Sequence, residues 1–132
     1  MSGETHIRTP LAKVRGRGSA KSGTEHFWHQ RLTAFANIPL TIAAVIIMIT
    51  LLGRNQAAVA QILGSPAITI IMLLFIASIT IHMRIGMAVV IEDYVHAPGL
   101  KTLGLVVSDF SHVLGAAAAV FAILKVALGG RW

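Results

Sequence analysis

The chain has 132 residues, of which 55% are hydrophobic and 12% are charged, whereas a soluble domain carries roughly 25% charged residues. With a mean hydropathy of +0.77, this composition indicates a membrane protein of three or four helices without a large domain outside the membrane. Because it has no cysteine, the chain alone forms no disulfide, thiolate zinc site or iron–sulfur cluster, whereas its histidines and methionines leave haem or histidine–metal ligation open.

The net charge of +6 is concentrated ahead of the first apolar segment. Six of the eleven basic residues lie there, namely Arg8, Lys13, Arg15, Arg17, Lys21 and Arg31. Basic residues that flank a span orient it toward the cytoplasm, whereas a nucleic-acid binder needs a basic face on a folded surface. We therefore exclude a nucleic-acid partner. We expect residues 1–23 to form a basic cytoplasmic tail, followed by a membrane domain over residues 24–132.

The first span is expected over residues 32–52, because about 21 residues at 1.5 Å each cross a hydrocarbon core ~30 Å thick. A short interfacial segment precedes it, since Phe27 and Trp28 suit the headgroup layer. The histidines in that segment are interpreted as interfacial anchors, and Arg31 lies at the edge of the hydrocarbon. Inside the span, Pro39 predicts a bend.

The second span is expected over residues 67–91, after a short interfacial helix over 57–63 and a start at Ser65-Pro66. Its second half carries His82 and Arg84 within an apolar run. At 100° per residue, a stripe within about 40° of His82 contains Ser78, Gly86, Val89 and Asp93. Arg84 points about 160° away from this stripe, so it is expected to reach the interface or to meet a separate anionic group.

A histidine inside a span is a candidate functional residue, because an ionisable group in hydrocarbon is costly. The residues alone leave three interpretations of His82 open: a haem ligand, a hydrogen bond between helices, or a proton relay. His112, in a third span expected over residues 103–128, is the other histidine within the membrane. Since successive spans run in opposite directions, both histidines lie in the same third of the membrane, and a pair within one chain is geometrically possible.

The second span ends in Asp93-Tyr94, about 16.5 and 18 Å along the helix from His82. A quinone headgroup needs a hydroxyl donor for its carbonyl oxygen and a supply of protons on reduction, and these two residue types provide both. A cytoplasmic N-terminus places this pair on the cytoplasmic side as well. The predicted fold is an all-α membrane protein with three transmembrane helices and a short interfacial N-terminal segment.

The pattern H-x-x-x-G-M-x-x-V-x-x-D-Y, from His82 to Tyr94, resembles the hydrophobic membrane anchor (D) subunits of succinate dehydrogenase. The segment EHFWHQRLTA, ahead of Pro39-Leu40, resembles the alphaproteobacterial members of that family. The resemblance covers residues 24–128, and residues 1–23 do not contribute to it. Arg84 and Ala88 depart from the better-known enterobacterial pattern, which has aromatic residues there.

The resemblance implies a multi-pass subunit of respiratory complex II in the bacterial inner membrane. Its partners would be a cytochrome b556 anchor subunit, an iron–sulfur subunit and a flavoprotein subunit, and the last of these would oxidise succinate. His82 would be one axial ligand of the iron of a haem b shared with the partner anchor, and Arg31 would lie near the haem propionates. Tyr94 and Asp93 would bind ubiquinone, which accepts electrons from the iron–sulfur subunit. His112 and Arg84 receive no role.

Two alternatives to this function stay open. An anchor of a quinol:fumarate reductase would run the reaction in the reverse direction. A non-redox membrane scaffold would use His82 only for a hydrogen bond between helices.

Overall fold

The computed structural model describes residues 21–129, which form helices joined by short connections and contain no strand. In chain order the helices are α2 (Lys21–Leu51), α3 (Gln56–Leu63), α4 (Pro66–Tyr94) and α5 (Pro98–Ala127). Three segments are long and apolar enough to cross a membrane: Phe27–Leu51, Pro66–Tyr94 and Pro98–Ala127. The predicted all-α fold with three spans is therefore confirmed. Most of the expected basic tail lies outside the described residues.

The helices extend beyond the predicted spans. The expected interfacial segment is the first part of α2 rather than a separate element, and α5 begins at Pro98 instead of near residue 103. Proline costs no hydrogen bond in the first turn of a helix, where N–H groups have no partner, so Pro98 starts α5 as Pro66 starts α4. Ser65 precedes Pro66 as expected, but its side chain makes no capping hydrogen bond.

The short helix α3 was predicted and is confirmed. It follows a turn in which Gly53 adopts a left-handed φ of 71°, a conformation that suits glycine because it has no Cβ. Asn55 caps the helix, since its side-chain oxygen accepts a hydrogen bond of 2.9 Å from the N–H of Ala58. The hydroxyl of Thr69 on α4 then donates to the carbonyl of Leu63 at 2.8 Å, which ties the end of α3 to the start of the second span.

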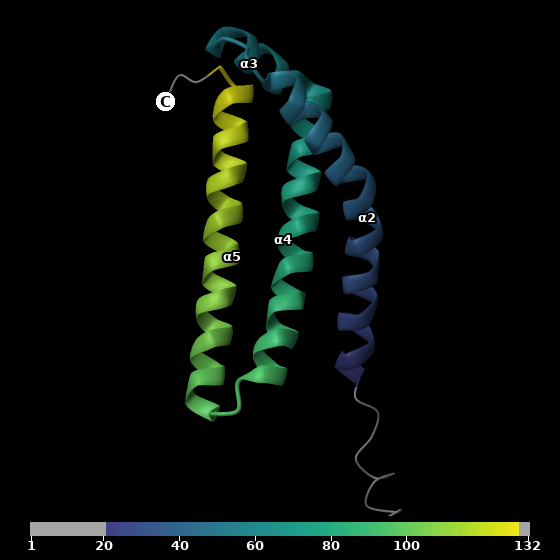
Figure 1. Ribbon diagram of the computed structural model, residues 1–132, viewed down its shortest axis with the longest axis vertical. Coiled ribbons are helices and arrows are strands. Elements are labelled where there is room, and N and C mark those ends of the chain that lie inside the picture. The colour runs from purple at the N-terminus through teal and green to yellow at the C-terminus, as the bar shows by residue number, and fades with distance from the viewer. Residues whose placement is uncertain (1–20, 130–132) are drawn as a thin grey trace, which may run out of the picture.

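Helix α4 lies between α2 and α5 and packs against both (Figure 1). The three long helices alternate in direction, so the start of α2 and the turn between α4 and α5 lie at one end of the molecule (Figure 1). Helix α3 and the end of α5 lie at the other end. The predicted bend of α2 is visible in the same view, and Pro39 lies inside this helix. The Asp93-Tyr94 pair thus shares its end of the molecule with the start of α2.

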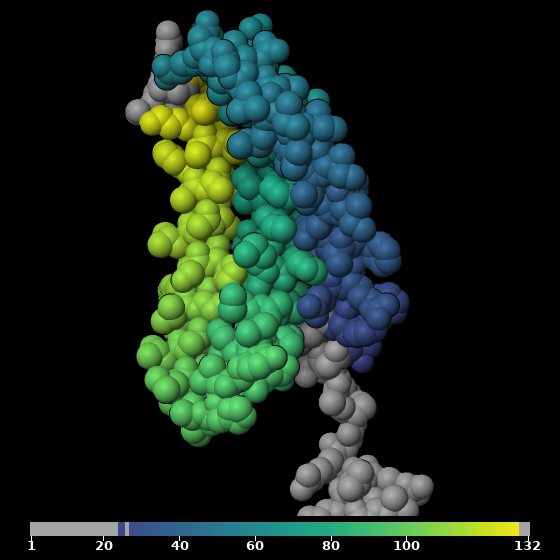
Figure 2. All heavy atoms as spheres, in the orientation of Figure 1, coloured from purple at the N-terminus to yellow at the C-terminus, as the bar shows by residue number. Residues whose placement is uncertain are grey.

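The described residues have almost no interior. Ala44 and Ile47 are the only hydrophobic side chains among them that are buried, and Thr33 and Thr69 are the only buried polar ones. The three helices lie side by side in a row in the space-filling view (Figure 2), so most apolar side chains point outward. Lipid or another helical subunit is expected to cover these faces, because residues 21–129 do not cover them.

Candidate functional site

One ring nitrogen of His82 faces α2. Its Nδ1 atom lies 3.2 Å from the Oγ1 of Thr33, a residue that is only 9% exposed. The Oγ of Ser78, one turn earlier on α4, lies 3.5 Å from the carbonyl oxygen of the same threonine. The predicted stripe therefore brings Ser78 and His82 together on one turn of α2.

Space is open beside Gly86, one turn after His82 on the same stripe. A Cβ atom built on this glycine would meet no atom within 4 Å. Among residues 21–129, the Nε2 atom of His82 also has no hydrogen-bond partner. The imidazole of His82 is thus half-buried, with Nδ1 held by Thr33 and Nε2 free beside open space. This arrangement fits a histidine that binds the iron of a flat macrocycle.

Asp93 and Tyr94 end α4 and are exposed, with 78% of Tyr94 accessible. The adjoining turn is fixed by Lys101 at the start of α5, whose Nζ donates to the carbonyl oxygen of Glu92 at 2.7 Å. Since α4 is one continuous helix, Tyr94 lies about 18 Å along the axis from His82. The structure thus keeps the expected quinone residues and the expected haem ligand apart, at two depths of one helix.

Arg31 does not join His82. Its guanidinium carbon lies 4.5 Å from the centre of the Phe27 ring, a cation–π contact within the first turns of α2. By helical phase, Arg31 points about 160° away from Thr33, which makes the contact to His82. A contact of Arg31 with haem propionates stays a prediction.

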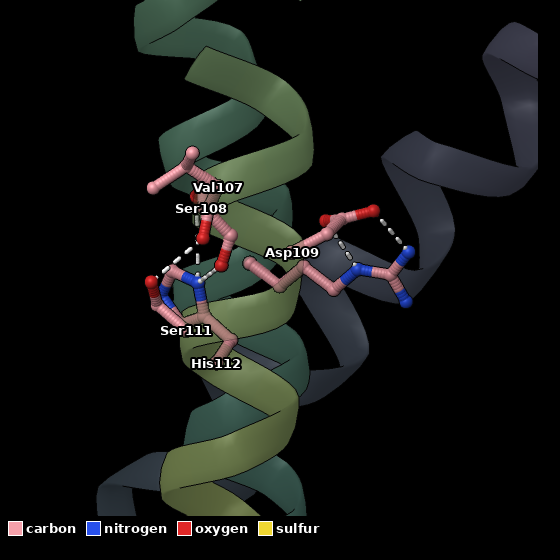
Figure 3. Close-up of polar contacts among 6 residues, drawn as sticks. Val107, Ser108, Asp109, Ser111 and His112 are labelled. Carbon is pink, nitrogen blue, oxygen red and sulfur yellow. Dashed lines mark hydrogen bonds and ion pairs between the residues drawn. The ribbon is translucent and has the colours of Figure 1, made fainter. Parts of the chain in front are cut away.

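Arg84 and Asp109 form an ion pair between α4 and α5 (Figure 3). The Nε and Nη2 atoms of Arg84 donate to the two carboxylate oxygens of Asp109, both at 2.7 Å. The prediction that Arg84 turns away from the His82 stripe toward an anionic group is confirmed. Asp109 as its partner was missed, although Arg84 lies ten residues before the end of α4 and Asp109 eleven residues after the start of α5. These similar separations from a tight turn were the signal that predicts the pair.

His112 is bound within its own helix. Its Nδ1 atom lies 2.7 Å from the carbonyl oxygen of Ser108, and its ring points to a different side of α5 from Asp109 (Figure 3). His82 makes its contact with α2 instead. The pair of histidines that the sequence left open is therefore not formed, and the described residues contain no cluster of three or more metal-ligating side chains.

A cleft of about 410 Å³ lies between the three long helices, at the end that carries Asp93-Tyr94. It is lined by Glu25, His29, Ile81, Arg84, Ile85, Ala88, Leu105 and Asp109. His29, interpreted from the sequence as an interfacial anchor, belongs to this cleft. The Arg84–Asp109 pair thus lies beside two further ionisable side chains from α2.

Four polar residues of α2 recur every four positions: Glu25 and His29, which line the cleft, then Thr33 and Asn37. This stripe was missed in the sequence, although a period of four places all of them on one side of a helix. At the end of this stripe, the Oδ1 of Asn37 is buried without a partner among residues 21–129.

These features define a class of protein: a three-span helical membrane subunit that leaves its helix faces uncovered and holds a histidine, His82, at a contact between two of its spans. Comparison with known proteins makes the assignment specific. The chain belongs to the family described as the succinate dehydrogenase/fumarate reductase transmembrane subunit, which matches residues 5–125. The family resemblance is confirmed, and it begins earlier than residue 24, so the expectation that residues 1–23 do not contribute was wrong.

Two curated relatives illustrate the similarity. The chain is 30% identical to the succinate dehydrogenase hydrophobic membrane anchor subunit of Paracoccus denitrificans, over 92% of this chain and 93% of the relative. It is 34% identical to the protein of the same name from Rickettsia bellii, over 80% of this chain and 85% of the relative. No solved structure gives a significant match.

Proposed function

We propose that the chain is the membrane anchor subunit of a succinate dehydrogenase, embedded in the bacterial inner membrane with its N-terminus in the cytoplasm. The observation that carries the proposal is the family match over residues 5–125, which includes His82, Asp93 and Tyr94. The uncovered helix faces support it, because an anchor needs a second membrane subunit to cover them. That subunit would be a cytochrome b556, and a flavoprotein and an iron–sulfur subunit would dock on the cytoplasmic side.

His82 would be one of the two residues that hold the iron of a haem b shared with the second anchor subunit. Its Nε2 is free among the described residues, and the space beside Gly86 is open. When bound, the haem would supply a one-electron redox centre within the membrane. The chain contributes the depth and direction of the imidazole, set by α4 and its contact with Thr33.

Asp93 and Tyr94 would form this chain's part of a ubiquinone site at the membrane surface. The phenol of Tyr94 would donate a hydrogen bond to a quinone carbonyl oxygen, and the carboxyl group of Asp93 would pass on protons from the cytoplasm. Reduction of the quinone to quinol takes two electrons, delivered by the iron–sulfur subunit, and two protons. Exposure of both residues beside the turn supports this role, because a docked subunit can reach them there.

Replacing His82 by alanine in the assembled complex tests the haem role. The reduced-minus-oxidised absorbance of the haem should disappear, or the midpoint potential of the haem should shift. His112→Ala is the matched control, because that histidine is bound within α5 and its loss should leave the spectrum unchanged. An unaltered spectrum and potential in the His82 variant would disprove the ligand role. Haem-free material with all partner subunits present would favour a non-redox scaffold.

Replacing Tyr94 by phenylalanine tests the quinone role. Succinate-driven quinone reduction should fall by roughly 10²-fold, the lower end of what a positioned proton donor contributes. Succinate oxidation with an artificial acceptor should remain, because that reaction belongs to the flavoprotein. If both activities fall together, the role of Tyr94 is not specific to quinone.

An anchor of a quinol:fumarate reductase is the second candidate, because the family description names both enzymes. The relatives named above are succinate dehydrogenase subunits, which favours the first. The quinone that co-purifies with the complex separates the two, since a low-potential quinone would indicate fumarate reduction.

A further inference from the structure

Thr33 is one of only four buried side chains in the described part of the chain, and it meets the proposed haem ligand directly. Its Oγ1 lies 2.8 Å from the carbonyl oxygen of His29, 3.1 Å from that of Gln30 and 3.2 Å from the Nδ1 of His82. A hydroxyl group has one hydrogen to donate and two lone pairs that accept. The three neighbours therefore decide which way each hydrogen bond runs.

The two carbonyl oxygens can only accept, so any hydrogen bond to them uses the hydroxyl hydrogen. A threonine within a helix commonly donates in this way to the carbonyl three or four residues earlier. If the Thr33 hydroxyl does so, its oxygen accepts from the Nδ1–H of His82, and two hydrogen bonds form. If the hydroxyl instead donated to Nδ1, the bonds to His29 and Gln30 would be lost and only one would remain. In a nearly buried position the arrangement with two bonds is favoured.

A neutral imidazole that carries its hydrogen on Nδ1 has its lone pair on Nε2. The Nε2 atom of His82 has no hydrogen-bond partner among residues 21–129. One turn further along α4, the space beside Gly86 is open. Ser78 makes only a long contact with the same turn of α2, its Oγ lying 3.5 Å from the Thr33 carbonyl oxygen.

We propose that Thr33 is a positioning residue that fixes the tautomer and the ring orientation of His82, so that Nε2 is presented to haem iron. The proposal rests on the proposed function of His82. Metal-ligating histidines generally donate their second N–H to a fixed acceptor, and loss of that acceptor typically weakens metal binding by 10- to 100-fold. Such a hydrogen bond also makes the imidazole more electron-donating, which favours ferric over ferrous iron.

The test compares Thr33→Val, which keeps the shape but has no hydroxyl, with Thr33→Ser, which keeps the hydroxyl. Both are made in the complete complex with all partner subunits. We expect the valine variant to lose haem 10- to 100-fold more readily on dilution and to show a more positive haem midpoint potential. The serine variant should resemble the unaltered protein. Ser78→Ala is the matched control, because it removes a hydroxyl from the same contact without touching the ring, and it should shift the potential less than Thr33→Val.

Two results would overturn the inference. One is a valine variant whose haem retention and potential match those of the unaltered complex. The other is an equal loss in the serine and valine variants, because packing rather than the hydroxyl would then be responsible. The outcome of His82→Ala separates the two proposals. If that variant loses its haem while Thr33→Val has no effect, the role of Thr33 is wrong and the ligand role stands. If His82→Ala keeps its haem unchanged, both fail together.

Discussion

Replacing Arg84 by methionine should destabilise the packing of α5 on α4 more than replacing Asp109 by asparagine. Both side chains are about half exposed, at 52% and 46%, and both lie roughly 15 Å along their helices from the turn. After Asp109→Asn, the long arginine side chain can turn toward Glu25, which lines the same cleft. After Arg84→Met, the short carboxylate of Asp109 remains roughly 15 Å from the turn without a guanidinium partner. An unpaired carboxylate is costly in hydrocarbon.

The magnitude follows from the geometry of the pair. Hydrogen bonds between membrane helices contribute about 0.6 kcal/mol on average and up to about 1.7 kcal/mol, and charge-assisted bonds are roughly twice as strong as neutral ones. Two parallel bonds of 2.7 Å therefore suggest a coupling free energy of about 2 kcal/mol. We expect Arg84→Met to lower the free energy of unfolding by about 2 kcal/mol, the coupling itself, and Asp109→Asn by about 1 kcal/mol.

The assay is a double-mutant cycle on the full-length chain in mixed micelles, with unfolding by SDS followed by circular dichroism. The double variant should lose less stability than the sum of the single variants, by the coupling free energy. Ser111→Ala is the control, because among the described residues this exposed hydroxyl bonds only to the Val107 carbonyl of its own helix, and it should change stability by less than about 0.5 kcal/mol. Additive single effects, or a larger loss in Asp109→Asn than in Arg84→Met, would refute the reasoning.

Three further outcomes are expected. Asn55→Ala should remove the cap of α3 and destabilise it by about 1 kcal/mol, seen as faster amide exchange confined to α3; exchange that is unchanged there would contradict the capping role. Gly86→Leu should leave the packing of this chain's own helices intact, because a Cβ atom at this position meets no atom of the described residues within 4 Å, but it should lower the haem content of the complex; full haem content would show that the open space is not used. Since the chain has no cysteine, single cysteines introduced as His96→Cys and Gln61→Cys show on which side of the membrane each connection lies. A membrane-impermeant thiol reagent should label His96→Cys from the cytoplasmic side and Gln61→Cys from the opposite side. Labelling of both from one side would exclude the three-span topology.

The three spans were predictable because each is an apolar segment longer than the ~20 residues that cross the hydrocarbon. The helix ends were not, and the reason lies in what hydropathy measures. Polar residues such as Glu25 and His29 lie ahead of the predicted span and still continue α2, because backbone hydrogen bonding does not require an apolar side chain. Hydropathy therefore located the apolar segment, whereas the helix α2 begins about ten residues before that segment.

Helical phase predicted which residues of α4 share a face, and it separated His82 from Arg84 correctly. It could not say which helix meets each face, because that depends on how three helices arrange themselves. The contact of His82 with Thr33 and that of Arg84 with Asp109 are both such tertiary choices. The same phase rule, applied to α2, would have marked Thr33 as facing the same way as His29.

The two polar contacts of α4 fix its rotation from opposite sides. His82 is held by Thr33 of α2, and two residues later Arg84 is held by Asp109 of α5. Because these side chains point about 160° apart, a rotation of α4 that relaxes one contact also breaks the other. Asp93 lies on the same rigid helix, so its direction at the membrane surface is set by the contacts that orient His82. The ion pair on the other side of α4 therefore resists the same rotation as the contact of His82 with Thr33.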